Sequence, residues 1–196
     1  MSGSIGPGVP IAEIVRLATV GRRVCVAAFE TLGQRSATAQ NSAARLGVAE
    51  VSRQIGETLA FWESLLPDAT GLQTLADDVA AEFEASTALA TFRQDLADRP
   101  LGLAARAVVT ALRREVATVS AECSPVADGE FMAVLAAIAV RLGHAQRAAE
   151  SALGDQPTPS LDQDVAPLLL LPGTRKTFST PLPVPNEQSN NHWTWQ

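Results

Sequence analysis

Aromatic residues are scarce in this sequence: they make up 5% of 196 residues, and tyrosine is absent. Sheet proteins draw heavily on aromatic and β-branched side chains. Here the 46% of hydrophobic residues must be supplied largely by alanine, valine and leucine. Alanine and leucine have high helix propensity, and small side chains let helices pack closely. The composition therefore predicts an all-α protein.

The chain also lacks a surplus of positive charge. Its 15 basic residues are outnumbered by 21 acidic ones, which gives a net charge of -6, and Lys176 is its single lysine. Proteins that bind nucleic acid need a concentrated basic surface to neutralise phosphates. The charge balance therefore argues against nucleic acid as a partner.

Cysteines and long apolar runs are few as well. Cys25 and Cys123 stand far apart and form no metal-binding spacing, so we expect two reduced thiols. The longest apolar run, "FMAVLAAIAV" at 131–140, is far shorter than the roughly 20 residues that a membrane span needs. The N-terminus "MSGSIGPGVP" shows no signal-peptide pattern. We expect a cytoplasmic protein with no membrane partner.

Proline divides the chain into three parts. Of 12 prolines, Pro7 and Pro10 precede the first helical pattern, Pro67, Pro100 and Pro125 stand at junctions, and the rest follow residue 155. The sequence thus predicts a flexible N-terminus (1–10), a helical bundle (11–154) and an extended, proline-rich tail (155–196).

Five segments of the middle part repeat apolar residues at helical spacing: 11–35, 40–66, 71–98, 101–123 and 128–153. Their stripes are, in order, Ile14, Ala18, Cys25, Phe29 and Leu32; Val48, Val51, Ile55, Leu59, Trp62 and Leu66; Leu72, Leu75, Val79, Phe83, Leu89 and Leu96; Val108, Leu112, Val116 and Val119; and Phe131, Leu135, Ile138 and Leu142. Ser86 interrupts the third stripe. Asp68 and Asp128 are candidate N-caps, and Gly154 is a candidate helix stop. Long helices with short connections predict an antiparallel bundle of four to five helices.

The stretch "RLGVAEVSRQIGETLAFW" resembles the metal-bearing helix of the ferritin-like superfamily, especially its bacterial tRNA-hydroxylase-like branch. "ADDVAAEFEAS" and "RREVATVSAE" resemble later helices of that branch. The resemblance implies a ferritin-like bundle with a degenerate di-iron ligand set. Glu50 stands at the first ligand position, but Arg53 and Thr118 occupy the places of the two histidines.

Helical geometry indicates what these carboxylates do. Glu50, Arg53 and Glu57 lie opposite the apolar stripe, so we expect a solvated charged face that binds no iron. Glu30 also points outward, Glu82 lies near the stripe's edge, and Glu115 faces inward. His144 and His192 have no nucleophile partner in any recognisable motif. We therefore expect neither a catalytic residue nor a metal or other cofactor.

The tail carries three short apolar segments, or apolar islands, between polar residues: "APLLLLP", "TFSTPLPVP" and "HWTWQ". An isolated disordered chain gains nothing from such groups, so they indicate docking. Trp193 and Trp195 are two residues apart, which in an extended chain places both indoles on one side. The predicted partner-binding residues are Leu168, Leu169, Leu170, Leu171, Phe178, Trp193 and Trp195.

Three functions remain open. The leading one is a non-catalytic interaction or scaffold protein whose tail docks on a protein partner or a neighbouring copy. Bacterial nanocompartment cargo proteins of the ferritin-like kind have a similar layout. The alternatives are a ferritin-like oxidoreductase or hydroxylase with an unusual ligand set, and an accessory protein that binds a small apolar ligand. The tail could also latch onto its own bundle, be inert, or be modified itself.

Overall fold

A computed structural model describes residues 8–153, and this part of the chain is helical without any strand. Its helices are α1 (Ile11–Thr38), α2 (Ser42–Glu63), α3 (Thr70–Ala85), α4 (Thr87–Asp98), α5 (Leu101–Glu122) and α6 (Gly129–Leu153). The all-α prediction is confirmed. The predicted tail, residue Gly154 and most of the predicted N-terminal segment lie outside the described residues. None of the six helices is long and apolar enough to cross a bilayer.

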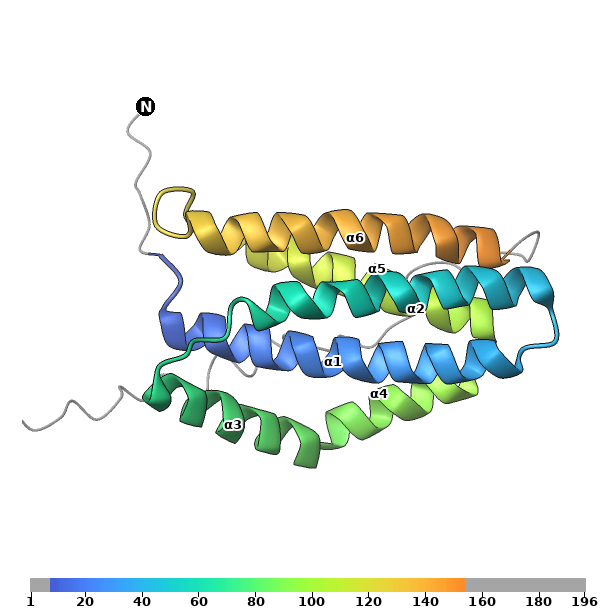
Figure 1. The fold of residues 1–196 in the computed structure, drawn as a ribbon, viewed down its shortest axis with the longest axis horizontal. Helices are drawn as coiled ribbons and strands as arrows, with labels where there is room; N and C mark the ends of the chain where they lie inside the picture. The colour runs from blue at the N-terminus through green and yellow to red at the C-terminus, as the bar shows by residue number, and fades with distance from the viewer. Residues whose placement is uncertain (1–7, 154–196) are drawn as a thin grey trace, which may run out of the picture.

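The helices run alternately up and down the bundle (Figure 1). α1 and α2 form an antiparallel hairpin, α3 and α4 return together in the direction of α1, and α5 and α6 form a second hairpin. α2 packs on both α1 and α6, and α6 packs on α5. α1 additionally contacts α3, α4 and α5. The predicted antiparallel bundle is confirmed, but residues 8–153 form six helices in place of the predicted four to five.

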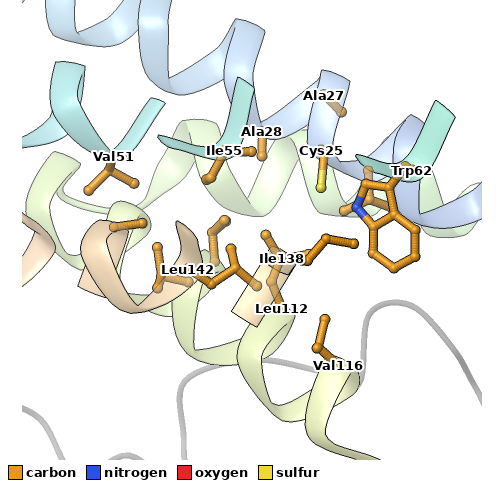
Figure 2. Close-up of a cluster of buried hydrophobic side chains, with 14 of the residues drawn as sticks. Cys25, Ala27, Ala28, Val51, Ile55, Trp62, Leu112, Val116, Ile138 and Leu142 are labelled. Carbon is orange, nitrogen blue, oxygen red and sulfur yellow. The ribbon is translucent and has the colours of Figure 1, made fainter. Parts of the chain in front are cut away.

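The core lies between α1, α2, α5 and α6 (Figure 2). Its side chains include Cys25, Ala27 and Ala28 of α1, Val51, Ile55 and Trp62 of α2, Leu112 and Val116 of α5, and Ile138 and Leu142 of α6. Most of them are small aliphatic groups, as the composition predicted. Each of the two C-terminal stripes predicted from the sequence is buried along its whole length.

The predicted single helix at 71–98 is wrong, because the chain breaks at Ser86. The backbone there is extended (φ -72°, ψ 148°), and the Ser86 hydroxyl donates to the carbonyl of Phe83 at 2.6 Å. A serine that bonds a nearby carbonyl competes with the helical ladder. The break gives two shorter helices, α3 and α4, that both pack on α1.

Phe29 also departs from its predicted place in the buried stripe, since it is 42% exposed. It lies over Gly56 of α2, where an added Cβ would come within 3.0 Å of the Phe29 ring. The two helices therefore approach closely at this edge, and the phenyl ring covers the seam between them from outside. Leu32, one turn later, is fully buried.

Polar groups secure the helix ends. Asn41 caps α2 by accepting from the backbone of Ala44, and Arg35 of α1 donates to the carbonyls of Leu96 and Arg99 at the end of α4. A cation suits these terminal carbonyls. The predicted cap Asp68 is wrong: α3 begins at Thr70, and its cap position holds Ala69. Asp68 lies one residue too early to reach the first turn.

Asp128 does occupy the position before α6, and its carbonyl accepts from Met132. Its carboxylate serves a different purpose from the predicted cap. Oδ1 accepts from the backbone N–H of Val9 at 2.9 Å, and Oδ2 accepts from that of Ser124 at 2.7 Å. One buried carboxylate thus ties the segment before α1 to the α5–α6 connection.

Candidate functional site

Glu50, which the sequence resemblance places at a metal-ligand position, forms an ion pair with Arg53 on α2. The Arg53 guanidinium makes a two-pronged contact with Glu50, with Nε 2.8 Å from Oε2 and Nη2 2.6 Å from Oε1. Gln54 Nε2 donates to the same Oε1 at 2.7 Å. Both oxygens of Glu50 are therefore already bound by donors from their own helix.

The pair extends into a network that reaches α6. Arg53 also contacts Glu57, and the second oxygen of Glu57 lies 2.7 Å from Nη1 of Arg141. Glu57 thus links α2 to α6 at the surface of the bundle. We call these four residues, Glu50, Arg53, Glu57 and Arg141, the α2–α6 charge network.

The electrostatics of this network favour the charged forms. The hydrogen bonds from Arg53, and then from Gln54, lower the pKa of Glu50 from 4.5 to about 2. His144 of α6 adds a smaller effect of the same sign. The contact with Glu50 in turn raises the pKa of Arg53. At neutral pH the charges of Glu50 and Arg53 therefore compensate each other.

The other candidate carboxylates do not gather around it. Glu30 and Glu82 are exposed, and Glu115 is half-buried. His144 is exposed on α6. Within residues 8–153 no three histidine, cysteine, aspartate or glutamate side chains form a cluster that could hold a metal ion. The described part of the chain thus does not assemble the ligand set that the resemblance implies.

The core contains one buried thiol, that of Cys25 on α1. Cys25 is 1% exposed, and the Thr58 hydroxyl of α2 lies 3.5 Å from its sulfur. Burial raises the pKa of the Cys25 thiol to about 11, although the hydrogen bond from Thr58 opposes the rise. Since the thiolate is the reactive form, Cys25 is an unreactive core group at neutral pH.

Cys123 follows α5 and is half-buried. Its thiol donates to the carbonyl of Val119 at 3.3 Å, and burial raises its pKa. Both cysteines are free thiols, as predicted. Neither has the electropositive surroundings that activate a nucleophilic cysteine.

The partner-binding residues predicted from the sequence all lie outside the described residues. This group comprises Leu168, Leu169, Leu170, Leu171, Phe178, Trp193 and Trp195, and His192 lies outside as well. Their docking stays a prediction.

The structure reveals an exposed apolar surface that the sequence analysis missed. Val140, in the middle of α6, is 60% exposed, and Ala133 and Ala136 on the same helix are exposed too. The apolar run at 131–140 could have indicated this surface. A helix that is apolar on all sides cannot bury every side against only two neighbouring helices.

Compared with models of known protein families, with curated proteins and with solved structures, the chain matches none. Function must therefore be argued from the residues themselves.

Proposed function

We propose that this chain is a non-catalytic helical interaction protein whose C-terminal tail, residues 155–196, docks on a protein partner or on a neighbouring copy. The observation that carries this proposal is that residues 8–153 close a core of their own, formed by all six helices. The apolar islands of the tail are then not needed to complete this core and can bind the surface of another molecule.

The chemistry of the described part supports a role without catalysis. Its α2–α6 charge network is internally compensated, and its buried thiol is held protonated. Ion pairs of this kind fix helices relative to one another. They offer no nucleophile or base to a substrate.

We further propose a ferritin-like ancestry without the metal, and a cytoplasmic location. Support comes from the order of helices: two antiparallel hairpins, α1–α2 and α5–α6, are joined by the long α3–α4 connection. Arg53, at a ligand position of the implied motif, pairs with Glu50 instead. In this proposal the ion pair replaced the metal as the group that satisfies Glu50.

The tail's two tryptophans provide the test. The full chain carrying both Trp193→Ala and Trp195→Ala is compared with the unaltered chain by light scattering and by pull-down of an untagged copy on a tagged one. A buried aromatic anchor is typically worth about 2 kcal/mol or more, so association should weaken by well over an order of magnitude. The melting temperature should stay almost unchanged.

The third tryptophan supplies the matched control. Trp62 is 3% exposed in the core and packs against Gly21 of α1. Trp62→Ala should lower the melting temperature strongly, by removing a core side chain. If the tail variant instead lowers the melting temperature and leaves association unchanged, the tail is a latch on its own bundle. Full association together with an unchanged melting temperature would contradict docking of the tail both on a neighbouring copy and on its own bundle.

A further inference from the structure

One line of residues on α6 faces away from the bundle. It comprises Glu130, Ala133, Ala137, Val140, His144 and Arg147, which we call the outer seam of α6. Ala137 is half-buried, and the other five are exposed. The spacing alternates between three and four residues, which is the pattern that a helix presents to a single partner helix in a coiled coil.

The seam has no partner in the described part of the chain. α6 packs on α2 and α5 through other residues, among them Leu135, Ile138 and Leu142. A Cβ added at Gly143, beside the seam, would meet nothing within 4 Å. Glu130 and Arg147 form no ion pair with another residue between positions 8 and 153. Within residues 8–153, neither the apolar nor the charged positions of the outer seam are therefore covered by another helix.

The order of charges along the seam indicates which helix could bind there and in which direction. An acid, Glu130, stands near the N-terminal end, a base, Arg147, stands near the C-terminal end, and alanine and valine lie between. A parallel copy would place like charges opposite each other. An antiparallel copy places Glu130 opposite the partner's Arg147, and Ala137 opposite the partner's Val140, with the same contacts repeated by twofold symmetry.

We propose that the outer seam of α6 binds a second copy of this chain, with the two α6 helices antiparallel. Small side chains in the middle of the seam let the helices approach closely, and the charged ends set the direction and register. A helix of 25 residues is about 37 Å long, and one helix pair of that length buries less than the roughly 1,600 Å² of a standard interface. The dimer is therefore weak and concentration-dependent.

This proposal is independent of the tail, because it uses only residues of α6. Its test measures the dissociation constant of the full chain by sedimentation equilibrium across a wide range of concentrations. The unaltered chain should approach twice its mass of 20.6 kDa at high concentration. Val140→Glu places two acids at the centre of the seam and should weaken the dimer by about thirtyfold or more.

A charge swap tests the direction of the pairing. Glu130→Arg alone and Arg147→Glu alone each oppose like charges at two symmetric places, and each should weaken the dimer by about five- to tenfold. The two changes together restore opposite charges, so the double variant should return to within about threefold of the unaltered chain. Ala117→Glu, at an exposed position of α5, is the matched control and should leave the dissociation constant unchanged.

Three outcomes would overturn the proposal. The full chain could stay monomeric at every concentration, or Val140→Glu could leave the dissociation constant unchanged. The double charge variant could also dimerise as weakly as each single charge variant. A dimer that is lost on changing Trp193 and Trp195 but is indifferent to the α6 variants would overturn the seam while supporting tail docking. A dimer that responds only to the α6 variants would support the seam and leave docking of the tail on a neighbouring copy contradicted.

Discussion

α1 and α6 are similar in length and in their content of alanine and valine, yet they occupy different environments. Thirteen of the 28 residues of α1 are buried, against seven of the 25 of α6. Residues 15–21 of α1 are buried without interruption, so this stretch is enclosed on all sides by its neighbours. α6 is buried along one stripe only and leaves Val140 in solvent.

The difference shows that a helix's composition does not decide its surroundings. α1 is enclosed because α3 and α4 cover the side that α2 and α5 leave open (Figure 1). α6 is last in the described part, and no corresponding pair of helices covers it. An apolar helix face of this kind either is covered by another molecule or remains exposed at some cost in solubility. We infer the first for α6.

The largest expected effect comes from making one substitution in both helices. Val24 of α1 is 1% exposed, whereas Val140 of α6 is 60% exposed. Val24→Ala removes two buried methyl groups and should lower the free energy of unfolding by about 2 kcal/mol. Val140→Ala should change it by less than about 0.5 kcal/mol. Chemical denaturation at low protein concentration, where a weak dimer is dissociated, measures both.

Equal losses in the two variants would contradict the difference between α1 and α6, because Val140 would then be as enclosed as Val24. The same experiment at high concentration separates folding from association. Only for Val140→Ala should the loss relative to the unaltered chain then grow with protein concentration, because Val24→Ala keeps the seam and gains as much from dimerisation as the unaltered chain does.

A glycine pair gives the next effect, with opposite signs in α2 and α6. A Cβ at Gly47 would come within 2.6 Å of the Ala152 Cβ and 3.0 Å of the Ala148 carbonyl, so Gly47→Ala must push α2 from α6. It should destabilise by about 1 to 2 kcal/mol, even after the better helix propensity of alanine. Gly143→Ala enters open space and should stabilise by up to about 1 kcal/mol. Thermal melts of the two variants should shift in opposite directions.

The sequence predicted which residues share a helix face, but it did not predict which faces would be covered. The stripes at 101–123 and 128–153 are buried as expected, because α5 and α6 pack these faces against each other and against α2. Phe29 shared a face with Leu32 and is nevertheless exposed, since the edge of the α1–α2 seam passes beneath it. The third apolar stripe was interrupted only at Ser86 and resumed beyond it, so the pattern did not indicate that the helix ends there.

The charged surface was predictable in part. Helical angles placed Glu50, Arg53 and Glu57 together on a polar face, and the structure confirms their contacts. The link from Glu57 to Arg141 joins residues far apart in sequence, so no local pattern could indicate it. Likewise, Asp128 could be recognised as a helix start but not as the group that holds Val9.

The smallest expected effect concerns the α2–α6 charge network. Surface ion pairs connect α6 to α2 on one side, whereas α1 is held by packed side chains. Glu50→Gln removes the charge that Arg53 binds. The Glu50 side chain is 42% exposed, so solvent screens the pair, and the loss in unfolding free energy should be about 0.2 to 0.5 kcal/mol at pH 7.

The pH dependence of that small loss identifies its source. The folded-state pKa of Glu50, about 2, lies below its ordinary value of 4.5, so its contribution is fully present above pH 4.5 and disappears as the pH falls toward 2. The stability difference between the unaltered chain and Glu50→Gln should therefore be constant at neutral pH and shrink over that acidic window. Urea titrations at several pH values measure it. A loss above about 1 kcal/mol at pH 7, or a difference that grows on acidification, would show that Glu50 supports the α2–α6 contact through more than a screened surface pair.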